Sequence, residues 1–158
     1  MTWVTGPNAR VIYQGALRQS QLIIEVATEE FIRWVTPVHN FCRAATEDVE
    51  LHGRTIRKGQ QVLLAYGAAN RDPVHFENPE TFDLARTPNH HISFGFGTHF
   101  CLGASLARLE LKEMFTKVLT RLPDIDMAVP QAELPWRNSN FITKLVATTL
   151  APLGMVSL

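Results

Sequence analysis

The sequence predicts a mainly α fold that also contains small antiparallel β-sheets, an α+β class. Residues 102–122 place apolar side chains at helical spacing, and residues 20–37 do so again further upstream. Between these two helices, residues 38–66 change to an alternating pattern of apolar and charged residues that glycine turns interrupt. Such a pattern is typical of short strands paired by hairpins. The 158 residues are enough for one domain with its own core.

Composition and charge narrow the classes of function. Lys plus Arg total 15 and Asp plus Glu total 15, so the net charge gives no indication of nucleic-acid binding. Two cysteines far apart argue against a disulfide framework and suit a reducing compartment. We find no signal peptide and no apolar run of bilayer length, so we expect a cytoplasmic protein without a membrane anchor.

Two helices are predicted in the first forty residues. Gly6-Pro7 precedes a short helix over residues 8–17, and Ser20 is a candidate N-cap for a second helix that Pro37 ends. One face of the second helix carries Ile23, Val26, Ala27, Glu30 and Trp34.

Glu30 therefore lies inside an apolar stripe, where an unpaired carboxylate is strongly unfavourable. Arg33 follows at i+3, close enough to pair with it. The alternative is a solvent-exposed pair between Glu29 and Arg33 at i+4, which would leave Glu30 unexplained. We therefore favour a buried pair between Glu30 and Arg33.

The alternating stretch of residues 38–66 predicts a small antiparallel sheet. Val49 and Leu51 alternate with charged residues, and turns follow at His52-Gly53 and at Lys58-Gly59. Cys42 lies in the same stretch with no motif around it, and we interpret it as a buried small apolar residue.

Three further segments complete the chain. Residues 69–82 form a long segment with little regular structure, and such a segment inside a compact domain usually has a functional role. The helix predicted over residues 102–122 has an apolar stripe that we assign to the core: Leu111, Met114, Phe115, Val118, Leu119 and Leu122. Residues 141–158 are apolar but interrupted, and we interpret them as strands and turns that return to the core.

The most informative stretch is the loop Phe94–Gly103, in which Cys101 stands directly before the long helix. A helix N-terminus presents unpaired N–H groups and a positive dipole end, which together favour an anionic sulfur. Gly95 and Gly97 allow unusual backbone angles and leave room for a flat ligand, and Gly103 removes a side chain that would face it. Apolar walls that exclude water from the sulfur are expected from Phe94, Phe96 and Phe100.

A thiolate in a dry site suits a soft metal. Only one cysteine lies in this stretch, which excludes a four-cysteine zinc or iron–sulfur site and suits a metal whose other ligands come from elsewhere, as in haem. Two alternatives stay open. Cys101 is an inert buried thiol in the first, and it joins His90, His91 and His99 around zinc in the second, although their spacing fits no regular zinc pattern.

Two motifs carry a resemblance to a known family. Phe94, Gly97, Cys101 and Gly103 fit Phe-x-x-Gly-x-x-x-Cys-x-Gly, which resembles the cysteine-ligand loop of the cytochrome P-450 family, the haem-thiolate monooxygenases. Residues 30–33 (Glu-Phe-Ile-Arg) resemble the family's Glu-x-x-Arg signature, at the usual separation upstream. The resemblance implies haem b as the cofactor, with Cys101 as its axial thiolate and metal ligand.

The resemblance runs from about Asn8 nearly to the C-terminus, and it covers well under half of the family. It implies a single partial domain over residues 1–158, the proximal C-terminal half of the family's fold. The distal helix with its Ala-Gly-x-(Asp/Glu)-Thr motif is absent from the sequence, so no distal catalytic residue is expected here. A truncated, non-catalytic remnant with weak or no haem binding is the alternative to an enzyme.

Further roles follow from the resemblance alone. Positions that the family uses for propionate contacts match His99 and Arg43, for which a backbone-bonded histidine and a solvated strand charge are the alternatives. Arg86 is the nearest candidate for the third member of the Glu–Arg triad, because Thr81 stands where many relatives have arginine.

The resemblance also implies partners. The intact protein is expected to hydroxylate a hydrophobic small molecule with O2, such as a sterol, terpene or fatty acid. Electrons would come from a ferredoxin or a flavoprotein that docks on the proximal face, where Arg108 and Lys112 are candidate contacts.

Overall fold

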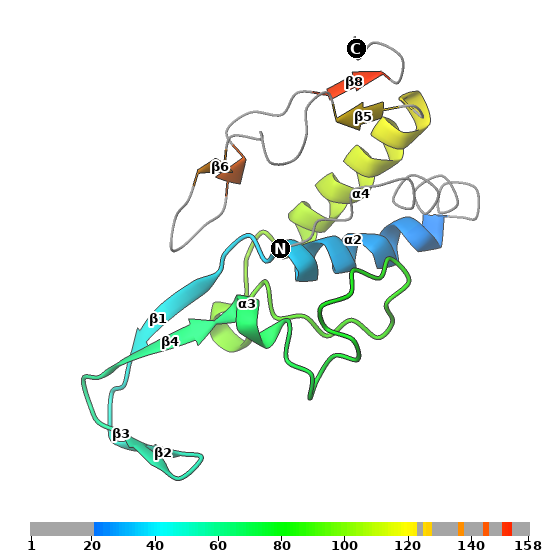
Figure 1. Ribbon diagram of the computed structural model, residues 1–158. Coiled ribbons are helices and arrows are strands. Elements are labelled where there is room, and N and C mark those ends of the chain that lie inside the picture. Colours follow the sequence, from blue (N-terminus) through cyan, green and yellow to red (C-terminus); the bar gives the residue numbers. More distant parts are fainter. Residues whose placement is uncertain (1–20, 123–124, 128–135, 138–143, 146–149, 153–158) are drawn as a thin grey trace.

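Two helices, α2 (Gln21–Val35) and α4 (Ala104–Arg121), form the body of the molecule. The structure, a computed structural model, describes residues 21–122 and four short strands at 125–127, 136–137, 144–145 and 150–152. The two helices cross and pack against each other (Figure 1). At their contact Phe31 stacks on Phe115, with ring centroids 4.6 Å apart. The helix predicted over residues 8–17 and the cap Ser20 lie outside the described residues.

Helix α2 ends where proline requires it. Residues that precede proline are disfavoured in the α conformation, and Thr36 takes a positive φ of 40° directly before Pro37. The Thr36 hydroxyl donates to the Arg33 carbonyl oxygen at 2.6 Å, and the Thr36 N–H donates to Ile32 at 3.0 Å. These bonds satisfy carbonyl groups that the end of a helix would otherwise leave unpaired.

An extended arm follows α2. Strand β1 (Asn40–Ala44) pairs antiparallel with β4 (Gln61–Ala65), and β2 (Val49–Leu51) pairs with β3 (Arg54–Ile56). The β2–β3 turn is built from His52 and Gly53, whose φ angles of 49° and 73° suit a tight hairpin.

The arm contains two ladders in series, where the sequence suggested one small sheet. At the junction the N–H of Ala45 donates to Gln60 at 3.0 Å, and the N–H of Gly59 donates back to Ala45 at 2.8 Å. Asp48 then accepts hydrogen bonds from Arg57 and from the Lys58 N–H, both at 2.8 Å. These side-chain and turn contacts replace the ladder there, so the strands separate into two pairs.

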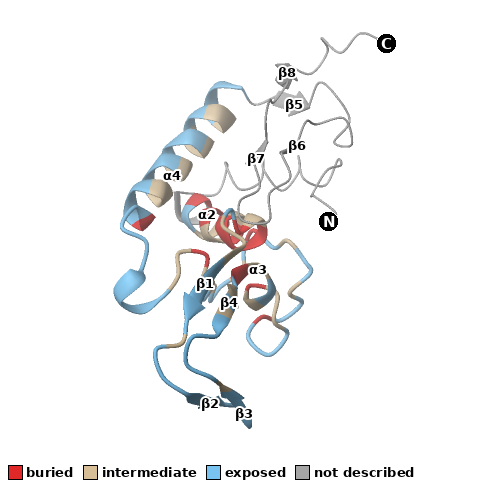
Figure 2. Cartoon of the chain, turned by 90° about the vertical axis from the view of Figure 1, so that its left-hand side faces the viewer, coloured by how far each residue is buried: buried red, intermediate tan, exposed pale blue. Residues whose placement is uncertain are grey.

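The arm stands away from the body, and this corrects the interpretation of Cys42. Figure 2 shows the arm as largely exposed, and Cys42 is an exposed free thiol in β1. A two-stranded ribbon has two open faces, so a strand residue in it is not buried unless another layer covers it. The described residues place no such layer over the Cys42 side chain.

The core lies between α2 and the irregular segment after the arm. Strand β4 leads into the short helix α3 (Tyr66–Ala69), and residues 71–92, here called the meander, contain no helix or strand. The ring of Trp34 packs edge-on against Phe82, with centroids 5.6 Å apart. Buried residues of α2, α3, the meander and α4 make up this core: Ile24, Ala27, Ile32, Trp34, Tyr66, Phe76, Leu84 and Ala104.

Helix α4 follows the cysteine loop, residues 94–103, which contains the short 3₁₀ helix η1 (Gly97–His99). The expected apolar stripe of α4 is only partly covered. Phe115 packs on α2, whereas Met114 and Leu122 remain 47% and 49% exposed, so these two are not core residues. Helix α2 packs on the side of α4 that carries Phe115, and it does not cover Met114 and Leu122.

Short strands complete the described structure. Strand β5 (Ile125–Met127) pairs antiparallel with β8 (Leu150–Pro152), and β6 (Trp136–Arg137) pairs with β7 (Lys144–Leu145). The expectation of strands near the C-terminus therefore agrees with β7 and β8. Among the helices of the described residues, none has the length and apolarity needed to cross a membrane. The combination of helices with small antiparallel sheets confirms the predicted fold class.

Candidate functional site

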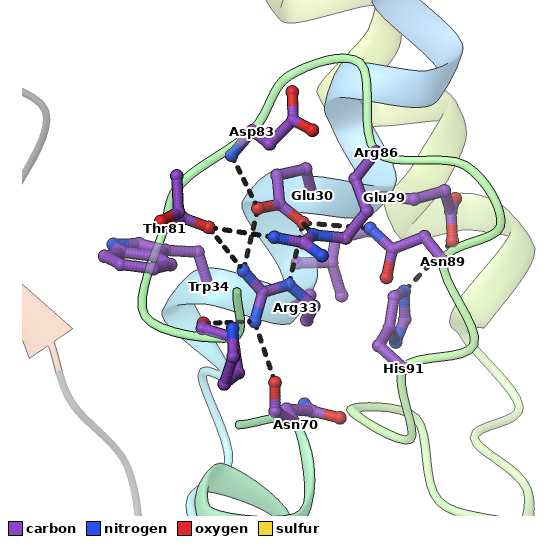
Figure 3. A network of polar contacts seen from close by, with 12 residues as sticks. Glu29, Glu30, Arg33, Trp34, Asn70, Thr81, Asp83, Arg86, Asn89 and His91 are labelled. Carbon is purple, nitrogen blue, oxygen red and sulfur yellow. Dashed lines mark hydrogen bonds and ion pairs between the residues drawn. The ribbon is translucent and has the colours of Figure 1, made fainter. Parts of the chain in front are cut away.

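A buried ion pair on α2 is the focus of a network of polar contacts (Figure 3). Glu30 and Arg33 are both 0% exposed, and they meet through two hydrogen bonds: Nε to Oε2 at 2.7 Å and Nη2 to Oε1 at 2.8 Å. Parallel bonds of this kind between guanidinium and carboxylate are the strongest ion-pair geometry in proteins. One turn of α2 fixes both residues, because i and i+3 positions share a helix face.

Arg33 uses all five of its donors. Besides the two bonds to Glu30, Nη1 donates to the carbonyl oxygens of Asn70 at 2.8 Å and Pro79 at 3.0 Å, and Nη2 donates to Thr81 at 3.1 Å. A buried guanidinium has no unmet hydrogen bond here, which removes the usual penalty of burying a charge. Arg33 thereby binds the meander to α2.

Arg86 approaches the same carboxylate from the meander. Its Nε lies 3.1 Å from Glu30 Oε2, and its side chain is 10% exposed. Its other nitrogens donate to the carbonyl oxygens of Glu77, Asn78 and Thr81. At Thr81 the backbone carbonyl takes part in the network, so the identity of that side chain does not decide the contact.

Two amide groups complete the shell of Glu30. The Asp83 N–H donates to Oε1 at 2.9 Å, and Asn89 Nδ2 donates to Oε2 at 3.0 Å. The carboxylate thus accepts five hydrogen bonds. Asn89 Oδ1 is the one buried side-chain polar atom without a hydrogen-bond partner among the described residues.

Asn70 connects this network to the segment before the cysteine loop. Its side chain is fully buried, and Nδ2 donates to the hydroxyls of Thr36 and Ser93, both at 2.8 Å. Its Oδ1 accepts the N–H of Ile92 at 2.8 Å. Ser93 in turn donates to the carbonyl oxygen of Ile32 at 3.0 Å. The start of the cysteine loop is therefore held against the end of α2.

A second charged cluster surrounds Glu29. Arg108 of α4 donates to its carboxylate through Nε at 2.6 Å and Nη2 at 2.9 Å, and His91 Nε2 lies 3.0 Å from Oε2. Burial raises the pKa of Glu29, but hydrogen bonds from His91 and Arg108 and the charge of Arg108 outweigh it and lower this pKa to about 2. The hydrogen bond to Glu29 in turn raises the pKa of Arg108 against the effect of burial.

This cluster excludes one alternative and changes one expectation. Glu29 pairs with Arg108 and His91, so the alternative pair of Glu29 with Arg33 does not form, in agreement with the favoured pair of Glu30 with Arg33. Arg108 is held in that pair and lies over the ring of Phe94, 4.6 Å from its centroid, while Lys112 pairs with Glu25. Neither cation is an uncommitted surface charge, which weakens both as docking contacts for an electron donor.

The cysteine loop is built on tight backbone turns. Gly95 and Gly97 have φ angles of 74° and 72°, a region that side chains rarely enter, as expected for these two glycines. The N–H of Cys101 donates to the Phe94 carbonyl oxygen at 2.9 Å, which closes the loop on itself. A Cβ added at Gly95 would meet the Tyr66 hydroxyl at 3.5 Å.

Gly103 is the N-cap of α4, which starts at Ala104 and therefore later than predicted. The N–H of Ala104 donates to the Cys101 carbonyl oxygen at 3.2 Å, so the helix begins immediately behind the cysteine. A Cβ at Gly103 would lie 3.9 Å from Cys101 Sγ. The missing side chain leaves that side of the sulfur open.

The aromatic residues of the loop do not enclose the sulfur, contrary to expectation. Phe94 is turned inward and packs edge-on against Phe100 at 6.4 Å, whereas Phe96 and Phe100 are 90% and 51% exposed. Cys101 itself is an exposed free thiol. The turns at Gly95 and Gly97 carry the later part of the loop outward, which explains why three aromatic residues nearby do not form a closed wall.

The two candidate propionate contacts lie on different elements. His99 is exposed at the end of η1. Arg43 is exposed in β1, donates to the Cys42 carbonyl oxygen at 3.2 Å and lies over the ring of Phe41. Among the described residues no group of three or more His, Cys, Asp or Glu could hold a metal ion, so His90, His91, His99 and Cys101 form no zinc site.

Sequence reasoning did not anticipate several members of the site. Asn70, Ser93 and Asn89 lie in irregular segments, where periodicity gives no signal for a buried polar residue. Glu29 and Arg108 are charged residues beside a motif, which is a weak indication of a role in the site. Their spacing in the sequence does not predict that they pair with each other.

Comparison with known proteins gives a consistent result. The family model described as Cytochrome P450 matches residues 16–131. A Steroid C26-monooxygenase of Mycobacterium tuberculosis (strain CDC 1551 / Oshkosh) is 45% identical over 143 residues, which are 87% of this chain and 38% of that protein. The Polyketide biosynthesis cytochrome P450 PksS of Bacillus subtilis (strain 168) is 46% identical over 130 residues, or 82% of this chain and 32% of that protein.

Solved structures agree with the sequence relatives. The Bacillus subtilis 168 PksS structure superposes with a TM-score of 0.80 at 44% identity and covers 86% of this chain and 35% of that one. CYP109E1 from Bacillus megaterium in complex with testosterone gives a TM-score of 0.84 at 36% identity, covering 90% of this chain and 39% of that one. The chain thus spans well under half the length of the relatives that it matches.

Proposed function

This chain belongs to the cytochrome P450 family, and on that premise we propose that it carries the haem-thiolate half of a monooxygenase, with Cys101 as the axial ligand. The family implies a haem-iron cofactor. The observation that supports Cys101 most directly is its placement: an exposed thiol on a closed glycine turn, with α4 beginning three residues later. A thiolate there faces the partial positive charge of a helix N-terminus.

The residues around Cys101 fit a large flat apolar group. Phe96, Phe100 and Leu102, which are near Cys101 in the chain, are exposed by 90%, 51% and 103%, and exposed large apolar side chains of this kind are typical of a surface that a ligand covers. The open side of the sulfur at Gly103 and the positive φ of Gly95 and Gly97 leave the backbone close to such a ligand. The donor set, one soft thiolate, also suits haem iron.

Bound haem would supply the oxygen chemistry, since a thiolate ligand pushes electron density toward iron and favours O–O cleavage. The chain's own residues contribute position. Cys101 would present its sulfur, and Phe94 would cover the inner side of the loop. Propionate groups would pair with His99 and Arg43, because buried anions require cations or strong donors. Glu30, Arg33 and Arg86 would hold the meander beneath this surface.

The proposal for the whole protein is O2-dependent hydroxylation of a hydrophobic small molecule. The named activity of the matched steroid monooxygenase and the testosterone complex of a structural neighbour support a sterol-like substrate. Terpenes and fatty acids remain in the same class of small apolar substrates. A non-catalytic remnant is the less favoured alternative, because matched relatives are monooxygenases by name.

Three further parts belong to the proposal. The domain is proposed to be a partial one that residues outside this chain complete. Electrons would come from a ferredoxin or flavoprotein donor. Two free cysteines, Cys42 and Cys101, support a reducing and therefore cytoplasmic location.

The test compares two cysteine variants of the haem-loaded protein. Cys101→Ala should abolish the red-shifted Soret band that thiolate ligation gives in the reduced carbon-monoxide complex. Cys42→Ala is the matched control, since both thiols are free and exposed, and it should keep the band. Survival of the band in Cys101→Ala would refute the assignment of the ligand.

A further inference from the structure

Glu29 and Glu30 are neighbours in α2, yet their carboxylates contact different segments. Glu30 takes its partners from Arg33 and from residues 83–89 of the meander, whereas Glu29 contacts His91, near the end of the meander, and Arg108 of α4, which flank the cysteine loop on either side. We propose that Glu29 is a positioning residue for Cys101, because it holds both ends of the cysteine loop on one carboxylate. This inference rests on the proposed role of Cys101 as the haem ligand.

The upstream end of the loop is held through His91. Its side chain is 2% exposed, with Nε2 3.0 Å from Glu29 Oε2. The Ser93 N–H donates to the other ring nitrogen, Nδ1, at 3.3 Å. Since Nδ1 accepts a hydrogen bond, the proton lies on Nε2, and His91 donates it to Glu29. Glu29 thereby fixes the ring against which the backbone at Ser93, directly before Phe94, is hydrogen-bonded.

The downstream end is held through Arg108. Its guanidinium makes two bonds to Glu29, at 2.6 and 2.9 Å, and lies over the ring of Phe94 at 4.6 Å from the centroid. Arg108 sits in α4, whose first residue is bonded to the Cys101 carbonyl oxygen. The ion pair between Glu29 and Arg108 therefore fixes two parts of the site at the same time. One is the start of α4, which follows Cys101 in the chain, and the other is the ring of Phe94, which precedes it.

The structure contains a natural control for this inference. Glu25 and Lys112 also join α2 to α4, one helical turn further from the loop, in a more exposed pair. Neither residue contacts the cysteine loop through a described hydrogen bond or ring contact. If both ion pairs only join α2 to α4, removal of either pair should affect the cysteine loop equally. If Glu29 positions the loop, only removal of the Glu29 pair should affect it.

The experiment measures amide hydrogen exchange and the thiolate Soret band in the haem-loaded protein. Glu29→Gln removes the charge and keeps the size of the side chain, so it should speed exchange in residues 92–104 by about tenfold. It should also lower the fraction of haem that shows the thiolate band. Arg108→Lys keeps the charge but loses the pair of hydrogen bonds that the guanidinium makes to Glu29. Its exchange rate in residues 92–104 should therefore lie between those of Glu29→Gln and the unsubstituted protein.

Two controls make the outcome decisive. Glu25→Gln should leave exchange in residues 92–104 unchanged, and Glu30→Gln should speed exchange first in residues 78–89. Unchanged exchange in residues 92–104 of Glu29→Gln would overturn the inference. An equal effect from Glu25→Gln would do the same, as would acceleration spread evenly over the chain.

Exchange also separates this inference from the proposed function. If Cys101→Ala keeps the thiolate band, the assignment of the ligand fails, and the exchange of residues 92–104 still decides whether Glu29 positions the loop. If Cys101→Ala abolishes the band while Glu29→Gln leaves both exchange and band unchanged, the ligand assignment stands and the role of Glu29 fails.

Discussion

Arg33 and Arg86 donate to the same two acceptors, the carboxylate of Glu30 and the backbone carbonyl of Thr81. Their Nε atoms lie 2.7 and 3.1 Å from Glu30 Oε2, and their Nη2 atoms lie 3.1 and 3.0 Å from the Thr81 oxygen. Two guanidinium groups that share acceptors in this way lie close together, and their charges repel each other unless an anion lies between them. Glu30 is therefore the anion that both cations share in the part of the chain that the structure describes.

Removal of that carboxylate should destabilise the protein strongly. Glu30→Ala leaves Arg33 buried without its anion, and we expect a loss of roughly 3–5 kcal/mol in the free energy of unfolding. Denaturant unfolding of the haem-loaded protein measures this. Glu25→Ala breaks a more exposed pair and should cost no more than about 1 kcal/mol. Similar losses in the two variants would contradict the central role of Glu30.

Substitution of Asn70 should also destabilise the protein, because it leaves buried polar groups without hydrogen bonds. Asn70→Ala removes the bonds to Thr36, Ser93 and the Ile92 N–H, and each buried group left unpaired costs about 1–3 kcal/mol. The comparison is Thr120→Ala, which removes an exposed side-chain bond to the Thr116 carbonyl and should change stability by less than about 0.5 kcal/mol. Thermal unfolding monitored by circular dichroism distinguishes the two. An Asn70 variant as stable as the Thr120 variant would show that water replaces the lost bonds.

Gly95 is expected to accept no side chain. Its φ of 74° disfavours any L residue, whereas a new Cβ would make only an ordinary contact with the Tyr66 hydroxyl, so the backbone strain of Gly95→Ala should cost about 1 kcal/mol and reduce haem retention. Gly67→Ala provides the control, because a Cβ there meets nothing within 4 Å and the φ is ordinary. The two variants are compared by denaturant midpoint and by haem content after gel filtration. Equal haem content and equal midpoints would show that the loop can change its backbone angles.

Acid should weaken the Glu29 cluster in a defined range of pH. The pKa of Glu29 is lowered to about 2 in the folded protein, from an ordinary value of 4.5. A depressed pKa contributes stability that is complete above about pH 4.5 and is lost as the pH falls through about 2. Because this carboxylate is only half-buried, solvent screening reduces the contribution to about 1–2 kcal/mol.

The measurement for this prediction is the stability difference between the unsubstituted protein and Glu29→Gln over a series of pH values. We expect the difference to be largest near neutral pH and to shrink as the pH approaches 2. A difference that grows on acidification would give the opposite sign and would contradict the lowered pKa.

The central ion pair could be predicted from the sequence because helix geometry determines it. An acid inside an apolar stripe requires a cation, and i+3 spacing supplies Arg33. The end of α2 and the β2–β3 turn of the arm follow equally local rules, through Pro37, His52 and Gly53. The cysteine motif is likewise local, and it predicts the family from ten consecutive residues of the sequence.

Contacts between distant segments could not be predicted in this way. Asn70 bonds to Ser93 and Thr36 only after the meander folds back on α2, and no periodic pattern marks a polar residue in an irregular segment. Arg108 was assigned to the surface because it is a basic residue on a helix, whereas its pairing with Glu29 depends on the packing of α2 against α4. The exposure of Cys42 depends on how far the arm stands from the body, which strand alternation does not specify.

The long reach of the contacts of α2 also has a kinetic consequence. The bonds from Glu30 to Asn89 and from Glu29 to Arg108 join residues that are 59 and 79 positions apart. Contacts between such distant positions require loop closure before they return any stability, and they slow folding. During synthesis α2 therefore emerges before the meander, and Glu29 reaches its final partner Arg108 only after the ribosome has released α4. A chain that stops before residue 108 would leave Glu29 without its arginine.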